Sequence, residues 1–332
     1  MIIAVTGASG HTGANLVRML LERGHCVRVF AHHDRRAFEE LDVEQCAGDL
    51  HNPESLQKLV NGAKAVFHLA ATITLKRDRQ GIAWRTNVDG TRNVAGACLS
   101  AGVKRLVHFS SIHAFSPYPA SQVVTESRSL ALDGALPAYD RSKAAAEQVV
   151  LDAVAHGLDA VIVNPTAMLG PFDFGPSYLG SALIDVVRGR LPVLVRGGFD
   201  WVDVRDVCKG ALAAMERGTS GERYILSGHY RPLAELAAMT ADIAGSPPPR
   251  FSVPLWTAYM GLPVAAVACA LRGKQPRFTS TSLWTMKHHQ QVSHEKASRE
   301  LGYKTRPLEE TVRDTLDWFR AKGLLKNGAR HV

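Results

Sequence analysis

The chain lacks the cysteine spacing that a disulfide framework or a zinc site requires. Its five cysteines are odd in number and scattered, and none forms a C-x-x-C pair; they are Cys26, Cys46, Cys98, Cys208 and Cys269. Free, scattered thiols are typical of proteins in reducing compartments. The cysteines therefore predict a cytoplasmic protein with no bound metal.

Long apolar runs are also missing. The first residues, MIIAVTG, have no basic leader, and their apolar run ends at Gly7, so they predict a strand and not a signal peptide. The most apolar segment covers 255–271 and contains a proline, and it is shorter than the roughly 20 residues that a spanning helix needs. We therefore expect no transmembrane segment, and we interpret 255–271 as a substrate-domain helix or, at most, a surface-associated one.

Basic residues do not cluster along the chain. The formal net charge of +8 suits nucleic acid, an anionic membrane surface, or an anionic cofactor or substrate. However, no block of arginine and lysine with interleaved aromatic residues occurs, and that pattern is typical of nucleic-acid binding. We therefore expect a small-molecule partner and no nucleic acid.

What the first half does contain is a regular alternation of strand and helix patterns. Short apolar runs rich in β-branched residues predict buried strands at 2–6, 27–31, 65–70, 105–110 and 160–164. Helical patterns lie between them and after them, at 11–24, 52–62, 83–102 and 138–157. This order predicts an α/β fold, a Rossmann-type doubly wound parallel sheet.

The alternation weakens after about residue 165. We predict that 1–165 form an NAD(P)-binding domain, to which about 199–228 return, because WVDV and ERYIL read as further strands of that sheet. Residues 166–198 and 229–332 are predicted to form a smaller, mostly helical substrate-binding domain. A loop rich in glycine, proline and aromatic residues follows residue 164 and suits the cover of a cleft.

A glycine-rich turn joins the first predicted strand to the first predicted helix. The segment VTGASGHTG places glycines at 7, 10 and 13. Glycines in this context allow a tight turn whose backbone N–H groups approach a pyrophosphate at the helix N-terminus. The turn residues that we expect to bind the cofactor are Gly7, Ser9, Gly10, His11, Thr12 and Gly13.

The end of the second predicted strand favours NADP. Enzymes that use NAD usually carry Asp or Glu there to bind the adenosine ribose, whereas this chain has Ala31. Positive charge and hydrogen-bond donors for a 2′-phosphate follow it, in His32, His33, Arg35 and Arg36. Asp34 leaves NAD open as the alternative, since it can turn inward. Asp49 and Leu50, in the segment GDL, are expected beside the adenine.

The segment AYDRSK, residues 138–143, places Tyr139 four residues before Lys143, so both side chains can share one face of a helix. A phenol with a pKa near 10 becomes a usable acid/base when a neighbouring ammonium stabilises the phenolate. By itself this spacing is a weak motif, and an ordinary charged helix surface is its alternative reading.

Taken in order, the motifs resemble the extended short-chain dehydrogenase/reductase family over nearly the whole chain, and most closely its dihydroflavonol 4-reductase-like, epimerase/dehydratase branch. They are TGASGHTG, GDL, HLAA, TNVDGTRN, FSS, YDRSK, NPTAMLGP, GERYILSG, KASRELGY and DTLDWF. The resemblance implies that Tyr139 is the general acid/base, that Lys143 lowers its pKa and binds the nicotinamide ribose, and that Ser111 binds the substrate oxygen. It further implies that Asn87 supports the central helix, that Ala70, Ala71, Pro165 and Thr166 line the nicotinamide, and that two copies pair through the helices at 83–101 and 138–156.

Three functions stay open, and the favoured one is an NADPH-dependent reductase of a ketone or aldehyde. The second is an epimerase or dehydratase of a nucleotide sugar with tightly held NAD, and the third is a non-catalytic NADP-binding regulator. Against the second, Ile112 and His113 stand where dehydratases of the family carry an acidic pair, Phe199 stands where a phosphate-binding Arg is common, and Asn164 replaces the Arg of a frequent R-P pair. The substrate is expected to be apolar and to contact His113, Phe115, Phe172 and Tyr178, with Tyr118, Phe174 and Trp201 as further aromatic candidates.

Overall fold

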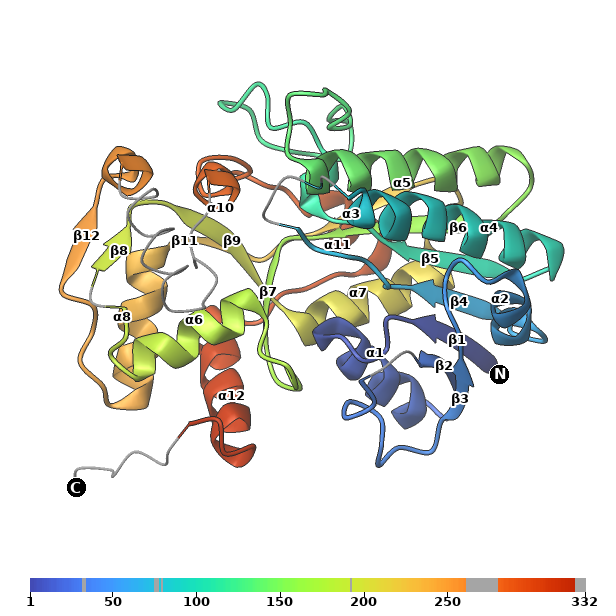
Figure 1. The fold of residues 1–332 in the computed structure, drawn as a ribbon, viewed down its shortest axis with the longest axis horizontal. Helices are drawn as coiled ribbons and strands as arrows, with labels where there is room; N and C mark the ends of the chain where they lie inside the picture. The colour runs from blue at the N-terminus through green and yellow to red at the C-terminus, as the bar shows by residue number, and fades with distance from the viewer. Residues whose placement is uncertain (32–33, 75–77, 79, 192, 261–279, 326–332) are drawn as a thin grey trace.

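A seven-stranded parallel sheet forms the centre of the computed structural model, which describes residues 1–31, 34–74, 78, 80–191, 193–260 and 280–325. Figure 1 shows this sheet in the half of the molecule that contains the N-terminus. The strand order is β10–β6–β5–β4–β1–β2–β3, and every neighbouring pair is parallel. The strands are β1 (Ile2–Thr6), β2 (Cys26–Ala31), β3 (Glu44–Ala47), β4 (Ala65–His68), β5 (Arg105–Phe109), β6 (Ala160–Pro165) and β10 (Arg223–Leu226). The predicted Rossmann-type sheet is confirmed.

Helices cover both faces of this sheet, which explains why its strands read as unbroken apolar runs. In β1, Ile3 and Val5 pack into one hydrophobic core, and Ala4 packs into the other. The first face is covered by α1 (His11–Glu22), α7 (Val204–Arg217) and α11 (Glu295–Leu301). The second is covered by α2 (Pro53–Val60), α4 (Gly90–Ser100) and α5 (Ala138–Ala155). Because the strand order reverses between β1 and β4, the carboxyl ends of these strands border the crevice where nucleotides bind in such folds.

The helix expected at 83–102 is not a single α-helix. It consists of the short α3 (Ile82–Trp84), the π-helical turn η1 (Arg85–Asp89) and α4. π-Turns of this kind occur most often at functional sites. This one contains Asn87, and its place in the site is described below.

The second region of the molecule contains two small sheets and several helices (Figure 1). Its strands are β7 (Ala167–Leu169), β8 (Val193–Val195), β9 (Gly198–Asp203), β11 (His229–Pro232) and β12 (Phe251–Val253), and its helices are α6 (Tyr178–Val187), α8 (Leu233–Ala244), α10 (Ser280–Thr285) and α12 (Leu308–Ala321). One prediction was wrong here: β9, which holds WVDV, does not join the large sheet. It pairs with β7 and β11 instead, and only β10 returns to the seven-stranded sheet.

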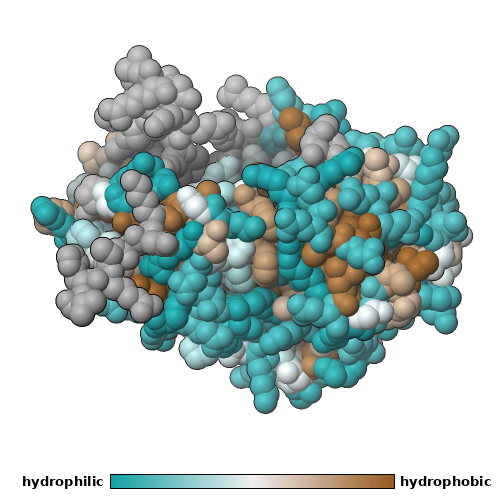
Figure 2. Space-filling view, turned by 90° about the horizontal axis from the view of Figure 1, so that it is seen from below, coloured by the Kyte–Doolittle hydropathy of each residue, from teal (hydrophilic) through white to brown (hydrophobic). Residues whose placement is uncertain are grey.

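Within the part of the chain that the structure describes, no helix is long and apolar enough to cross a membrane. Of the apolar segment 255–271, residues 255–260 are helical, and the rest lies outside the described residues. Figure 2 shows one face of the molecule, which is mostly hydrophilic with a few separate apolar patches.

Candidate active site

The fold brings the three predicted catalytic side chains together at the carboxyl end of β5. Ser111 follows β5 and caps the 3-10 turn η2 (Ile112–Ala114), where its Oγ accepts a hydrogen bond from the His113 backbone N–H at 3.2 Å. Tyr139 lies in the first turn of α5, and Ser111 is near enough to its hydroxyl to lower the pKa of the phenol. Lys143, one turn further along α5, donates from Nζ to the Phe109 carbonyl at 2.9 Å. A hydroxyl, a phenol and an ammonium are therefore fixed to one strand end and one helix.

Burial sets the protonation state of this group. Desolvation raises the pKa of Tyr139 to about 12, although the Ser111 hydrogen bond lowers it, and Asp140 raises it further. Desolvation also lowers the pKa of Lys143 to about 8, and Glu147 opposes this shift. At neutral pH the phenol is consequently protonated and the amine is largely charged. This combination suits a proton donor with a cation beside it.

Asn87 connects α5 to the loop that follows β4. Its side-chain amide accepts from the Thr72 N–H at 2.7 Å and donates to the Thr72 carbonyl at 3.0 Å and to Ser142 Oγ at 2.9 Å. Ser142 in turn donates to the carbonyl of Tyr139 at 2.7 Å. The π-turn that carries Asn87 thus connects the loop after β4 to the helix that holds the acid.

The glycine turn allows a test of whether a dinucleotide fits. A Cβ on Gly7, whose φ is +71°, would lie 2.6 Å from the Ala70 nitrogen, and one on Gly13 would overlap the Gly7 carbonyl oxygen. Packing within the protein therefore explains these two glycines. Gly10 differs, because its φ of −74° is ordinary and its added Cβ would meet only the Gly7 oxygen, at 3.4 Å. The open space beside Gly10 is what an approaching pyrophosphate needs.

The start of α1 supports the same conclusion. This helix has Gly10 as its N-cap, with no side-chain cap and no acidic residue in its first turn, so its first N–H groups are available to an anion. The side chains of two predicted cofactor residues have partners within the protein. His11 Nε2 lies 3.1 Å from the Gly170 and Pro171 oxygens, and Thr12 Oγ1 donates to the Met168 sulfur at 3.4 Å. These contacts leave the backbone N–H groups of both residues available, and it is through such groups that we expect the turn to bind the cofactor.

The segment after β2, which we predicted to determine the choice between NAD and NADP, contains an ion pair between Arg36 and Asp34. Ala31 is buried at the strand end. Arg36 binds Asp34 through two nitrogens, at 2.6 and 3.0 Å, whereas Arg35 is exposed. His32 and His33 lie outside the described residues. Asp34 therefore compensates the charge of Arg36 and leaves Arg35 as the more available cation.

The remaining predicted cofactor residues lie at strand ends or in the loops that follow them. Asp49 Oδ1 accepts from the His51 N–H at 2.7 Å, and Leu50 is buried beside it. Ala70 donates its N–H to Thr6 Oγ1 at 3.2 Å, and Ala71 follows it after β4. Thr166 comes directly after Pro165, the last residue of β6, and its hydroxyl donates to Asp200 at 2.6 Å. Strands β3, β4 and β6 thus place these residues along the edge of the sheet where the glycine turn lies.

The predicted substrate residues do not share one place. Phe115 is fully buried in a core cluster with Ile112, Val124 and Ile225, so it cannot line a cleft. Phe172 packs against Phe174 and Trp318, with the Arg18 guanidinium 4.3 Å above its ring. Tyr178 is 63% exposed, Tyr118 is 57% exposed and Trp201 is buried. These positions correct the aromatic-pocket prediction, because aromatic type alone does not distinguish core from cleft.

His113 is the predicted substrate residue that stays beside the acid. Its ring meets the Tyr139 ring edge to face at a centroid distance of 5.8 Å, and its Nδ1 lies 3.6 Å from the Asp140 carboxylate. A second histidine, which the sequence did not indicate, packs against it: His289 at 5.5 Å. His289 lies 176 positions along the chain from His113, and no motif connects the two, so only the fold could show this contact.

Asn164 does not bear on the substrate in the way that the sequence suggested. Its amide donates to Glu147 at 2.5 Å and to the Ser111 carbonyl at 3.1 Å, and the residue is completely buried. Asn164 therefore contributes to packing behind the site. The absence of an Arg before Pro165 is then no argument for or against a nucleotide-sugar substrate.

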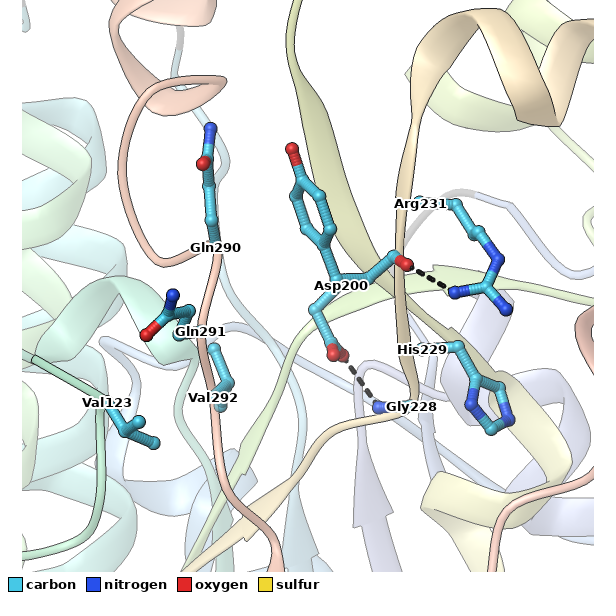
Figure 3. Close-up of a pocket in the computed structure, with 9 residues that line it drawn as sticks. Val123, Asp200, Gly228, His229, Arg231, Gln290, Gln291 and Val292 are labelled. Carbon is cyan, nitrogen blue, oxygen red and sulfur yellow. Dashed lines mark hydrogen bonds between the residues drawn. The ribbon is translucent and has the colours of Figure 1, made fainter. Parts of the chain in front are cut away.

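A cavity of about 410 Å³ lies between the 290–292 segment and the β9–β11 ribbon (Figure 3). In this view Gln290 and Gln291 lie across the opening from Asp200 and Arg231, and Asp200 accepts from the Gly228 N–H at 2.6 Å. The cavity contains none of the three catalytic residues. Asp200 nevertheless connects it to Thr166, and so to the predicted nicotinamide wall.

Comparison with known proteins agrees with this geometry. The NAD dependent epimerase/dehydratase family matches residues 3–227. Sterol demethylase protein B of Methylococcus capsulatus is 35% identical over 98% of this chain and 100% of its own. The 2-alkyl-3-oxoalkanoate reductase of Stenotrophomonas maltophilia is 32% identical over 91% and 94%.

A solved structure extends the likeness to three dimensions. The crystal structure of gox2253 superposes with a TM-score of 0.85 at 35% identity, covering 98% of this chain and 99% of the other. The chain therefore belongs to the NAD dependent epimerase/dehydratase family, whose NAD(P)-dependent enzymes act on hydroxyl or carbonyl groups and are extended short-chain dehydrogenases/reductases.

Proposed function

We propose that the protein is an NADPH-dependent reductase of a ketone or aldehyde, which also runs as an alcohol dehydrogenase in reverse. The observation that carries this proposal is that Ser111, Tyr139 and Lys143 lie together at the carboxyl end of β5, where Ser111 acts on the Tyr139 hydroxyl and Lys143 is bound to the Phe109 carbonyl. Because the phenol is protonated at neutral pH, Tyr139 is ready to act as an acid toward a carbonyl oxygen.

Each residue has a defined part in this reaction. NADPH, when bound, supplies the hydride that forms the new C–H bond. Ser111 donates a hydrogen bond to the substrate oxygen and orients it, and Tyr139 gives its proton to that oxygen, so that the C=O group becomes an alcohol. Lys143 stabilises the resulting phenolate until a solvent proton replaces the one lost. In the reverse direction Tyr139 accepts the proton from the alcohol.

The surroundings of Phe199 support an apolar substrate. Phe199 packs against a cluster that contains Val195, Leu283 and Met286, and its ring meets Trp201 at 5.3 Å. Unlike the Arg that is common at this place, Phe199 itself offers a diphosphate no hydrogen-bond donor, whereas apolar surface gains about 25 cal/mol per Å² on burial. The names of the two relatives, which refer to a sterol and to an alkyl-substituted oxoalkanoate, fit an apolar carbonyl compound.

His113 is proposed to contact the substrate next to the reacting carbon. Its Nδ1 is buried, yet 22% of its side chain is exposed, so the free part of the ring is the edge away from Asp140. Since a carboxylate only accepts, Asp140 favours an N–H at Nδ1 and leaves Nε2 for the substrate. His113 would then hydrogen-bond an oxygen substituent close to the carbonyl.

NADPH is preferred to NADH on the evidence of one exposed arginine. Ala31 offers no carboxylate for the ribose, and Arg35 is free to meet a 2′-phosphate. Asp34 opposes this preference, since it faces the same region and pairs with Arg36. We therefore expect tighter binding of NADPH than of NADH, by a smaller factor than two unpaired arginines would produce.

The alternative is an NAD-dependent epimerase or dehydratase of a nucleotide sugar, which the family name supports. Against the dehydratase, Ile112 is buried after Ser111 and His113 follows it, so no acidic pair is present there. A non-catalytic NADP-binding regulator is the second alternative, and the intact catalytic group speaks against it.

The test is NADPH consumption on a panel of apolar ketones and aldehydes, compared with turnover of a set of nucleotide sugars. We expect reduction of at least one apolar carbonyl compound and no turnover of the sugars. Epimerisation or dehydration of a sugar without reduction of any carbonyl would establish the alternative instead.

A further inference from the structure

A completely buried carboxylate lies directly behind the proposed catalytic group. Glu147 is one turn beyond Lys143 on α5 and has no exposed surface. Its two oxygens meet partners from two neighbouring strands of the large sheet. Oε1 accepts from Asn164 of β6 at 2.5 Å, and Oε2 lies 2.9 Å from Arg223 Nε of β10.

This buried group is connected to the active serine. The Asn164 amide that binds Glu147 also donates to the Ser111 carbonyl at 3.1 Å. The backbone of Ser111 is therefore held from behind by Asn164, which Glu147 binds in turn.

Glu147 also acts on Lys143, through the electrostatic effect of its charge. Burial raises the pKa of Glu147, and Ser110, Arg223 and Asn164 act in the opposite direction. Burying a carboxylate without partners is costly, and Asn164 and Arg223 supply the partners that offset this cost. The other ionisable groups that influence Lys143 from the sheet are His68 and His108, and both are held neutral by burial. Glu147 is the anion that acts on this lysine.

We propose that Glu147 is a positioning residue for the reaction, which fixes Ser111 through Asn164 and stabilises the ammonium of Lys143 from one turn away, with Arg223 as its counter-charge. The inference rests on the proposed function in so far as Lys143 and Ser111 serve carbonyl reduction. The cluster itself is independent of which substrate the protein reduces.

The first variant is Glu147→Gln, which keeps the shape and removes the charge. Removing the anion should lower the pKa of Lys143 from its value of about 8, so the alkaline limb of the pH–rate profile should move to lower pH. Tyr139, whose pKa burial raises to about 12, and His68, lowered to about 3, do not titrate between pH 6 and 9. His108 is also shifted well below that range. The limb therefore reports on Lys143.

The matched control is Glu222→Gln. Glu222 also forms an ion pair, with Lys296 at 2.5 Å, but half of its side chain is exposed. A second variant, Glu147→Gln with Arg223→Gln, removes both charges of the pair together, because a single removal leaves an uncompensated partner that can prevent folding. Thermal unfolding identifies which of these proteins are folded.

The readout that needs no turnover is trace acetylation with acetic anhydride across pH, followed by mass spectrometry of the peptide that contains Lys143. We expect Lys143 to become reactive at lower pH in Glu147→Gln and in the double variant than in wild type and Glu222→Gln. A drop of one pKa unit would also reduce turnover about tenfold above the new pKa, while turnover near pH 6 would change less.

Folded variants with the labelling profile and alkaline limb of wild type would overturn the proposal. If the wild type reduced no carbonyl compound, the proposed function would fail, yet the acetylation profile would still decide whether Glu147 acts on Lys143. The two failures can therefore be told apart.

Discussion

The seven-stranded sheet and the small-sheet region differ in how their structure relates to the sequence. In the large sheet, the inner strands are short apolar runs buried on both faces, the edge strand β3 is polar and mostly exposed, and the polar residues of the site follow the strand ends. In the small-sheet region, strands of three to six residues form two separate sheets. Large side chains there remain exposed, such as Phe251 at 66% and Trp256 at 63%.

The difference shows where each part of the function is encoded. The large-sheet region depends on local signals, because a glycine turn and a strand end act through their own backbone. The small-sheet region depends on contacts between distant segments. His289 reaches the Phe115 carbonyl at 3.0 Å, and Arg306 binds Asp206 at 2.8 Å. Changes in the first region should therefore have separable effects, which the following variants examine.

The largest effect is expected within the glycine turn. Gly13→Ala places a methyl group against the Gly7 carbonyl and Ala8 backbone, and overpacking against rigid backbone should cost roughly 3 kcal/mol of unfolding free energy. Gly10→Ala meets no such obstacle and should unfold like wild type, but should weaken NADPH binding at least about tenfold. Denaturant unfolding and fluorescence titration measure the two effects. Equal loss of stability in both variants would contradict the separation.

The second largest effect is expected at Tyr139, the proposed proton donor. Tyr139→Phe removes the proton donor and should lower turnover by at least about 100-fold while NADPH affinity is largely retained. Tyr178→Phe, at an exposed position in the small-sheet region, is the control and should leave turnover unchanged. Steady-state kinetics together with cofactor titration test this pair. Turnover near wild type in Tyr139→Phe would remove this residue from the mechanism.

Low pH should destabilise the large sheet, because a buried histidine must be protonated. His68 lies between Thr6 Oγ1 at 2.7 Å and Thr91 Oγ1 at 2.9 Å, and burial lowers its pKa from 6.5 to about 3. Since the unfolded chain binds the proton first, stability is complete above pH 6.5 and falls below it, by about 2 kcal/mol at pH 5.

Urea unfolding between pH 5 and 8 measures this loss. His68→Asn should reduce the slope with pH, and His156→Asn, at an exposed helix end, should not. A His68→Asn protein with the wild-type slope would show that other groups cause the acid sensitivity.

The smallest effect concerns the cofactor phosphate. Asp34→Asn releases Arg36 from its ion pair and removes a negative charge, so the preference for NADPH over NADH should rise several-fold. Arg35→Ala should reduce it by a similar factor. Titration with both cofactors gives the ratio, and equal affinities of the wild type for NADPH and NADH would refute the NADP assignment.

The sequence predicted the parts of the fold that local chemistry determines. The strands, the glycine turn and the spacing of Tyr139 and Lys143 depend on neighbours in the chain. The pairing of β9 with β7 and β11 could not be predicted, because WVDV reads equally well as a strand of either sheet. Phe115 and Phe172 were assigned to the substrate on residue type, whereas burial and stacking partners come from segments far away. The same holds for Glu147, whose partner Arg223 lies 76 residues further on.

The most direct measurement of the central claim is the fate of the hydride. NADPH deuterated at C4 of the nicotinamide is incubated with the protein and a ketone that it consumes, and the product is analysed by mass spectrometry. With the deuterium on the transferred face, the account predicts an alcohol that contains one deuterium per NADPH oxidised, and no such product with Tyr139→Phe on the same timescale. A product formed from a nucleotide sugar without net oxidation of the cofactor would contradict it.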